Sequence, residues 1–259
     1  MAREGSIRVG TSGWNYGHWK GPFYPDGARD SDLLGLYAER FDTVEVNNTF
    51  YQLPATRTIE RWVRAVPDGF VFAVKASRYI THMKKLKDPK QATAKFLERI
   101  EAFGGKLGPV LFQLQPTWRV NPERLEAFLE ALPSGLRYAF EFRDESWYGE
   151  EVYGLLRRHH AAFCVYELAG HRSPREVTAG FVYVRLHGPK RAYQGSYPSE
   201  ALSEWGAALS GWSTAGDVYC YFDNDERGYA PRDALRLRSL LGQRYASDRE
   251  SGQGGGRGA

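Results

Sequence analysis

Five short apolar runs of this sequence each end in two polar residues that stand two positions apart. The pairs are Glu45 with Asn47, Lys75 with Ser77, Gln113 with Gln115, Glu141 with Arg143, and Arg185 with His187. Glutamate, lysine and histidine are common general acids and bases, and arginine and lysine bind the oxygens of phosphates and carboxylates. If the fold brings the five runs together, the set predicts acid–base chemistry on a small anionic ligand, with or without a sugar.

We assign catalytic roles to four of these residues and expect a hydrolase or a lyase. Glu45 or Glu141 would be the general base, and His187 would be the acid or a hydrogen-bond donor. Lys75 would bind an anion or, with a lowered pKa, form a Schiff base.

Ligand binding is assigned to further polar groups of these strand ends and to aromatic rings of the loops that follow them. Rings beside polar groups suit stacking against sugars or bases. The ligand-binding candidates are Trp14, Asn47, Tyr51, Gln113, Arg143, Trp147, Arg185 and Asn224. Among the rings, Trp14 and Trp147 are the preferred candidates.

Eight apolar runs rich in Val, Phe, Tyr and Leu predict strands. They cover residues 7–11, 43–47, 71–76, 110–115, 137–142, 162–167, 182–186 and 218–222. A helical pattern follows each strand except the sixth, where residues 169–180 are too few and too polar for a full helix. This alternation predicts a (β/α)8 TIM-type barrel with a short or irregular sixth helix. An open doubly wound sheet is the alternative, but no G-x-G-x-x-G follows the first strand.

Side chains two positions apart on a strand point the same way, so each polar pair shares one face of its strand. The residues between the paired positions are apolar and suit the helix-covered face of a barrel: Val46, Ala76, Leu114, Phe142 and Leu186. We therefore expect the polar set to point into the carboxyl-terminal mouth of the barrel, where barrel enzymes place their active sites. The alternative is a network of compensating ion pairs that only plugs the barrel.

We expect one barrel domain over residues 6–242 and a disordered, glycine-rich tail over residues 243–259. The tail carries too little apolar area to offset the entropy of ordering it. No apolar run is long enough to span a membrane, and the N-terminus lacks the pattern of a signal peptide. Cys164 and Cys220 lie in separate apolar runs, so we expect a cytoplasmic protein without disulfides or membrane contact. The sequence carries no signal for an oligomeric state.

A metal centre and a nucleophilic triad are both weakly supported. Glu45, Glu141, Glu167 and His187 could together ligate an ion, but the H-x-H and H-E-x-x-H spacings are absent and nearby cations can pair with the acids. We therefore expect no metal and no cofactor. The G-x-S-x-G motif of serine hydrolases is also absent. A glycosidase pair formed by Glu45 and Glu141 stays open, because the distance between their carboxyl groups is not encoded in the sequence.

Nucleic-acid binding or phosphodiester cleavage is an alternative function. The net charge of +4, from 35 basic and 31 acidic residues, permits such a partner without requiring it. The loop after the third strand is basic and could contact a phosphate backbone through Arg78, His82, Lys84, Lys85, Lys87 and Lys90. The remaining alternative is a non-catalytic scaffold that only recognises a ligand.

A series of longer motifs resembles the YecE-like family, also called domain of unknown function 72. The series includes GTSGWNY at 10–16, EVNNTFY at 45–51, VKASRYITH at 74–82, FQLQP at 112–116, EFR at 141–143, VRLHG at 184–188 and YFDND at 221–225. The resemblance implies a TIM-type barrel and no settled activity, and its site residues coincide with the polar set. The sequence departs from the family pattern at Asn48, Gln115, Asp144 and Asp223, where the family would have Ser, Pro, His and Asn. The Asp144 departure puts in doubt any mechanism that would use that histidine.

Overall fold

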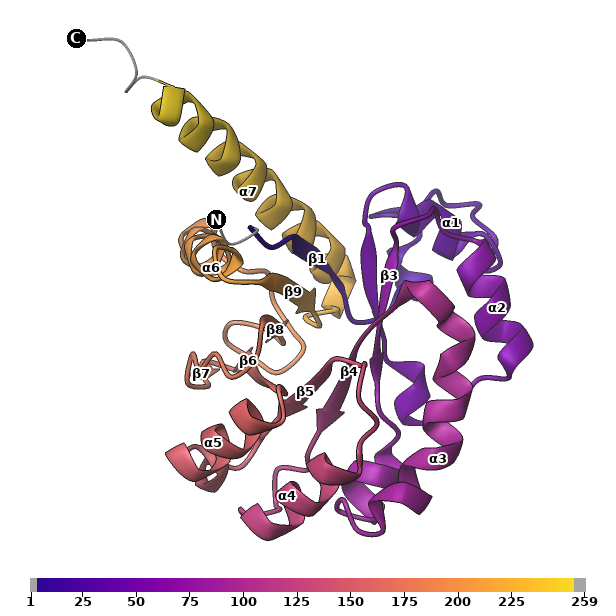
Figure 1. Cartoon of the computed structure of the whole chain (residues 1–259). Coiled ribbons are helices and arrows are strands. Elements are labelled where there is room, and N and C mark those ends of the chain that lie inside the picture. The colour runs from indigo at the N-terminus through magenta and orange to yellow at the C-terminus, as the bar shows by residue number, and fades with distance from the viewer. Residues whose placement is uncertain (1–3, 254–259) are drawn as a thin grey trace, which may run out of the picture.

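The computed structural model describes residues 4–253, with side chains described up to Gly242. Within these residues, eight parallel strands form a nearly closed barrel with helices around it (Figure 1). The strands are β1 Ile7–Thr11, β2 Thr43–Val46, β3 Val71–Lys75, β4 Leu107–Gln113, β5 Tyr138–Glu141, β6 Ala162–Leu168, β8 Phe181–Leu186 and β9 Asp217–Phe222. All eight predicted strands are therefore confirmed, β1 with its predicted bounds and the other seven with bounds shifted by one to three residues.

The order of strands around the barrel is β1-β9-β8-β6-β5-β4-β3-β2. The remaining gap, between β1 and β2, is closed just beyond the strands by a bridge between Ser12 and Glu45. The backbone N–H of Gly13 donates to the carbonyl of Glu45 at 2.8 Å. This closure excludes the open doubly wound sheet and brings the end of β1 beside the end of β2.

The helices occupy the predicted positions. They are α1 Leu33–Ala38, α2 Thr56–Arg64, α3 Pro89–Ile100, α4 Pro122–Ala131, α5 Glu150–Arg158, α6 Ser199–Ser213 and α7 Tyr229–Gln253. Short helical turns supplement them at η1 Gly17–Trp19, η2 Asn48–Phe50, η3 Tyr79–Met83, η4 Glu101–Lys106, η5 Glu145–Trp147 and η6 Glu226–Gly228. Helix α4 begins at an Asn-Pro pair, and the Asn121 side chain caps it by accepting a hydrogen bond from the Arg124 N–H at 2.8 Å.

The connection between β6 and β8 and the C-terminal segment are the two places where the sequence predicts irregular structure. Between β6 and β8 the described chain forms no helix but a short strand, β7 His171–Arg172, antiparallel to β6, which confirms the irregular sixth connection. At the other end of the chain, α7 continues to Gln253, past the predicted domain end at residue 242. The sequence there has no proline, and the glycines that would end a helix begin only at Gly252. Residues 254–259 of the predicted tail lie outside the described residues.

The inside of the barrel is filled by small residues on one side and large rings on the other. Small side chains such as Ala73, Ala139 and Ala162 come from β3, β5 and β6, whereas Tyr183 and Tyr221 come from β8 and β9. These tyrosine rings lie within the barrel core and turn their hydroxyls toward polar partners: Tyr183 donates to Glu45 at 2.7 Å, and Tyr221 shares a 2.7 Å hydrogen bond with Thr43. The packed core therefore lies directly beneath the polar groups of the mouth and contacts them.

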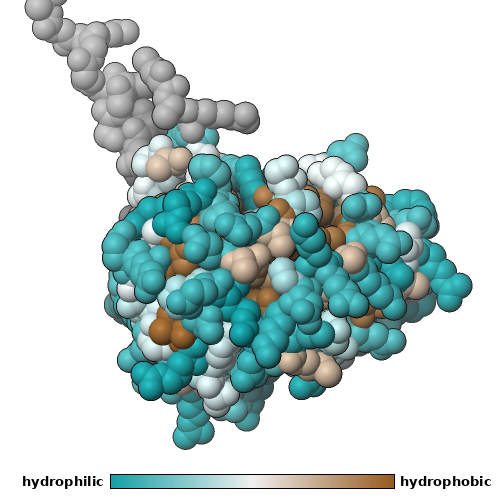
Figure 2. All heavy atoms as spheres, turned by 60° about the horizontal axis from the view of Figure 1, so that its bottom comes forward, coloured by the Kyte–Doolittle hydropathy of each residue, from teal (hydrophilic) through white to brown (hydrophobic). Residues whose placement is uncertain are grey.

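None of the helices within residues 4–253 combines the length and the apolar character that a bilayer span requires. Figure 2 shows a mostly hydrophilic face, on which apolar side chains are exposed only in small, separate patches.

Candidate functional site

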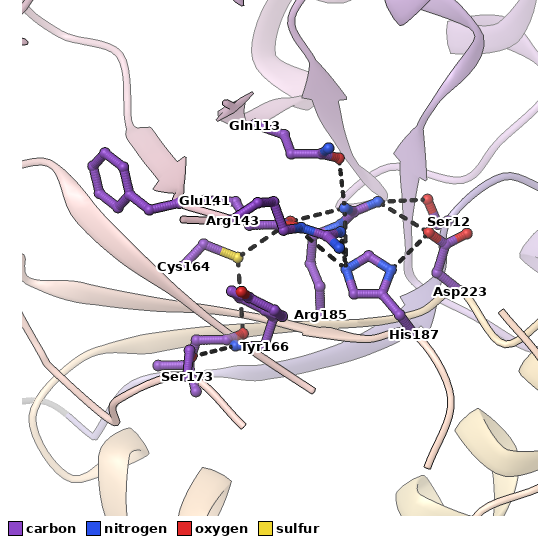
Figure 3. A network of polar contacts seen from close by, with 12 residues as sticks. Ser12, Gln113, Glu141, Arg143, Cys164, Tyr166, Ser173, Arg185, His187 and Asp223 are labelled. Carbon is purple, nitrogen blue, oxygen red and sulfur yellow. Dashed lines mark hydrogen bonds and ion pairs between the residues drawn. The ribbon is translucent and has the colours of Figure 1, made fainter. Parts of the chain in front are cut away.

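A fully buried arginine joins the acids of the barrel mouth. Arg185 follows the inward phase of β8 and donates to Glu45 at 2.7 Å. It also donates to Glu141 at 2.8 Å and to Gln113 at 3.4 Å (Figure 3). These acceptors come from β2, β5 and β4. Ser12, at the end of β1, also accepts from Arg185 at 3.2 Å. Four strands are thus tied to β8 by one guanidinium, and the predicted convergence of Glu45, Gln113, Glu141 and Arg185 is what the structure shows.

His187 sits beside Arg185 between an acid and two arginines. Its Nδ1 lies 2.9 Å from Asp223, and its Nε2 lies 3.0 Å from Arg143 and 3.3 Å from Arg185. A guanidinium can only donate hydrogen bonds, so Nε2 acts as the acceptor. Nδ1 faces Asp223 and can donate to it, and Nε2 also lies 3.5 Å from a Glu141 oxygen.

The acids of the mouth are held in their charged form. Burial alone would raise the pKa of Glu141, but the nearby charges of Arg143 and Arg185 hold that pKa well below its usual value. Burial likewise acts to raise the pKa of Asp223, and the hydrogen bond from His187 together with the charge of Arg185 outweighs it and lowers the pKa. Burial alone would lower the pKa of Arg185. The charges of Glu45, Glu141 and Asp223 outweigh burial and raise that pKa well above its usual value. The mouth therefore holds permanent charges of both signs at neutral pH.

Lys75, at the end of β3, differs from the other cations. Its Nζ lies 4.3 Å from the centre of the Phe50 ring, and no side chain of the described residues gives it a hydrogen bond or an ion pair. Burial, with a further contribution from the charge of Arg185, lowers the pKa of Lys75 to about 8. The residue is 7% exposed. Lys75 is thus a nearly buried amine at the mouth whose charge lacks a paired acid.

The members of this site differ in their access to solvent. We call Ser12, Glu45, Lys75, Gln113, Glu141, Arg143, Arg185, His187 and Asp223 the polar cluster. Glu45, Glu141, Arg185 and His187 are 0% exposed, whereas Lys75, Asp223, Arg143 and Gln113 keep some exposed surface. The lower part of the cluster is thus a closed ion network, as the plug interpretation expected, and its upper part faces the mouth.

Three of the predicted ligand-binding residues line a cavity next to the polar cluster. Trp14, Asn47 and Tyr51 belong to a cavity of about 650 Å³ between the loops after β1 and β2 and the helices α1 and α2. None of the predicted catalytic residues lines it. The residues that the sequence placed in one site therefore divide between a charged cluster and a neighbouring cavity. We call the latter the aromatic cavity.

Two predicted ligand-binding residues have structural roles instead. Trp147 is 0% exposed, stacks on Phe142 with ring centres 4.9 Å apart, and donates its indole N–H to the Trp118 carbonyl at 2.7 Å. It therefore packs in the hydrophobic core and offers no face to a ligand. The Asn224 side chain donates to the Gly195 carbonyl at 2.8 Å and to Asp233 at 2.9 Å. These bonds tie the loop after β9 to the loop after β8 and to α7, away from the polar cluster.

Ser12, Tyr183 and Asp223 are members or direct partners of the polar cluster that the site prediction did not include. The alternation of side chains along a strand could have identified two of them. Tyr183 lies on the same face of its strand as Arg185 and His187, and Asp223 lies on the same face as Tyr221. Ser12 donates to Glu45 from the end of β1, and its neighbourhood to β2 follows only from closure of the barrel.

No three His, Cys, Asp or Glu side chains of the described chain are placed to hold a metal ion. The carboxylates that could have served are occupied by arginines, as the contacts of Glu45 and Glu141 show.

Comparison with known proteins now places this geometry in a family. The sequence matches the family described as "Protein of unknown function DUF72" over residues 8–254. The chain belongs to the DUF72 family. The resemblance found in the motifs is therefore confirmed, and the DUF72 barrel carries no established reaction with it.

Individual DUF72 relatives support this assignment over nearly the whole chain. A DUF72 family protein from Thermotoga maritima superimposes with a TM-score of 0.84 at 30% identity, covering 92% of this chain and 99% of that one. The UPF0759 protein YunF of Bacillus subtilis is 23% identical, covering 93% of this chain and 96% of YunF. A glycoside hydrolase family 5 enzyme from Prevotella bryantii superimposes with a TM-score of 0.52 at 12% identity, and the match covers 90% of this chain and 95% of that enzyme's chain. That last similarity shows the shared barrel fold alone.

Proposed function

We propose that this protein is an enzyme that binds a small anionic ligand at the carboxyl end of the barrel and acts on it by acid–base chemistry. The observation that carries the proposal is Lys75, an ammonium at the mouth without an acid of its own. A buried cation without a partner is costly, so a bound carboxylate or phosphate would complete it. The lone, buried thiols of Cys164 and Cys220 agree with a cytoplasmic location.

In this proposal Lys75 and Arg143 hold the anionic group. Arg143 has an ion pair with Glu141 and a contact with His187, and its guanidinium lies over the Tyr166 ring at 4.8 Å. When Arg143 turns toward a ligand, it leaves one oxygen of Glu141 and one side of the His187 Nε2, which keeps its 3.3 Å contact with Arg185. These two groups then move the proton, with Asp223 holding the imidazole in one tautomer.

The buried layer beneath supplies position rather than contact. Glu45 is bonded to Ser12, Tyr183 and Arg185, and it is wholly enclosed by them. We therefore assign Glu45 and Arg185 to holding Glu141 and His187 in place. Packed and hydrogen-bonded partners of this kind fix the rotamers of catalytic groups.

Binding of inorganic phosphate and sulfate, measured by isothermal titration calorimetry, tests the anion site. We expect Lys75→Met to lower the affinity about tenfold or more, since it removes a nearly buried charge contact. Lys95→Met is the matched control, because Lys95 is an exposed lysine on α3, outside the polar cluster. Affinity in the unmodified protein should fall as the pH rises past about 8, where Lys75 loses its proton. Equal affinity for both variants and the unmodified protein would overturn the anion site.

Turnover separates an enzyme from a binding scaffold. The protein is incubated with a mixture of phosphorylated and carboxylated metabolites, and the mixture is followed by mass spectrometry. We expect one substrate to be consumed by the unmodified protein and by Lys95→Met, and not by Lys75→Met. A compound that binds through Lys75 and is recovered unchanged would show a non-catalytic binding protein.

A further inference from the structure

The aromatic cavity is separate from the polar cluster and has no role in the proposed chemistry. It lies where the loops that follow β1 and β2 meet the sides of α1 and α2. Helix α1 has only six residues, and both it and α2 contribute residues to the cavity lining. The volume of about 650 Å³ falls within the range of pockets that bind small molecules.

Four aromatic side chains line the cavity: Trp14, Tyr16, Tyr51 and Trp62. Trp14 and Trp62 meet edge to face with ring centres 5.0 Å apart. Tyr51 stands at the rim with 73% of its surface exposed, although a ring of this size is normally covered. A ligand ring that enters between Tyr51 and the two indoles would cover these surfaces.

Two polar groups of the same cavity lack partners. The Asn47 side-chain oxygen is buried and accepts no hydrogen bond. Arg61, on α2, has no acid or hydrogen-bond acceptor for its guanidinium among the described side chains. Asp30 also lines the cavity, but it is paired with Lys20 at 2.8 Å. The cavity therefore offers one buried acceptor without a partner and one solvent-exposed cation that is free to pair with an anion.

We infer that the aromatic cavity binds a phosphorylated ring compound, a nucleotide or a sugar phosphate. The ring lies against Trp14, Trp62 and Tyr51, one of its N–H or O–H groups donates to Asn47, and the phosphate pairs with Arg61. Aromatic stacking suits both a base and the apolar face of a sugar. This inference does not depend on Lys75, and it stands or falls separately from the proposed function.

Calorimetric titrations with adenosine 5′-monophosphate, glucose 6-phosphate and inorganic phosphate test the inference and identify the kind of ring. We expect at least one of the two ring compounds to bind at least about tenfold more tightly than inorganic phosphate. Tighter binding of the adenosine compound indicates a nucleotide site, and tighter binding of the glucose compound indicates a sugar phosphate site. Quenching of tryptophan fluorescence should accompany binding, because Trp14 and Trp62 both line the cavity.

Two variants assign the binding to this cavity. Arg61→Gln should weaken binding of the ring compound about tenfold or more, while Arg64→Gln, three residues along α2 and outside the cavity, should leave it unchanged. Asn47→Leu should also weaken binding, and it should raise the melting temperature of the free protein, because it removes an unpaired buried acceptor. A merely structural Asn47 would show the opposite change in stability.

The outcomes distinguish this inference from the proposed function. Binding of a ring compound that Arg61→Gln abolishes and Lys75→Met leaves intact supports the cavity, whatever happens at the mouth. Binding that responds to Lys75→Met and not to Arg61→Gln overturns the cavity inference and supports the mouth. If neither ring compound binds more tightly than inorganic phosphate, the cavity inference is wrong.

Discussion

Arg185 and Glu45 are joined at 2.7 Å across the inside of the barrel, although their strands β8 and β2 are not neighbours in the sheet. The same guanidinium reaches Glu141 at 2.8 Å. Both acids and the arginine are completely buried. Removing the arginine would therefore leave two carboxylates without solvent and without their main cation.

We expect Arg185→Met to destabilise the protein by about 3–5 kcal/mol, the usual effect of breaking a buried ion pair from one side. Urea unfolding at pH 7 measures the change. Arg158→Met is the control, since its pair with Glu126 is exposed and should contribute less than about 1 kcal/mol. Adding Glu45→Gln and Glu141→Gln to Arg185→Met should restore part of the loss. A triple variant no more stable than Arg185→Met would contradict this account.

Two neighbouring acids should respond to pH with opposite signs. Burial raises the pKa of Asp225 to about 6, although Trp19 and His18 contact its carboxylate. The folded protein therefore binds a proton more readily than the unfolded chain between pH 3.8 and about 6, and stability falls as the pH rises through that window. Asp225→Asn should then stabilise the protein by about 1–3 kcal/mol at pH 7 and by little below pH 4.

Asp223→Asn is the counterpart, since the pKa of Asp223 is lowered in the folded state. The charged form of Asp223 stabilises the fold at neutral pH, and that stabilisation is lost as the pH falls through its folded pKa. Asp223→Asn should therefore destabilise the protein at pH 7 and matter less in acid. Unfolding free energies of both variants from about pH 2 to pH 8 check the pair, because the pKa of Asp223 lies below 3.8 in the folded state. Curves of the same sign would refute the assignment.

Trp147 and Tyr51 provide a third test, because the sequence placed both in the ligand site and the structure separates them. Trp147→Ala should cost about 3–5 kcal/mol through loss of core packing. Tyr51→Ala should change stability by less than about 0.5 kcal/mol, since the ring is largely exposed. Chemical denaturation measures both. A small effect of Trp147→Ala would show that the ring is not part of the core.

The sequence alone determined the eight strands, their order along the chain and the direction of most inward polar residues. These features depend on local rules: apolar runs form strands, and alternate side chains share a face. Glu45, Glu141, Arg185 and His187 therefore converge as the spacing predicts.

The tertiary structure decided what those residues contact and what encloses them. Trp147 and Tyr51 follow strand ends in similar loops, yet one is buried and the other exposed, because burial of a loop side chain depends on packing between distant segments. Asn224 is a second example, because its hydrogen bond to Asp233 of α7 holds it away from the mouth. Lys75 is a third, because the acids that could pair with it are paired with Arg185 instead. Neither pairing across the barrel nor the cavity beside a short helix can be read from spacing along the chain, since both depend on distances between strands and helices in space.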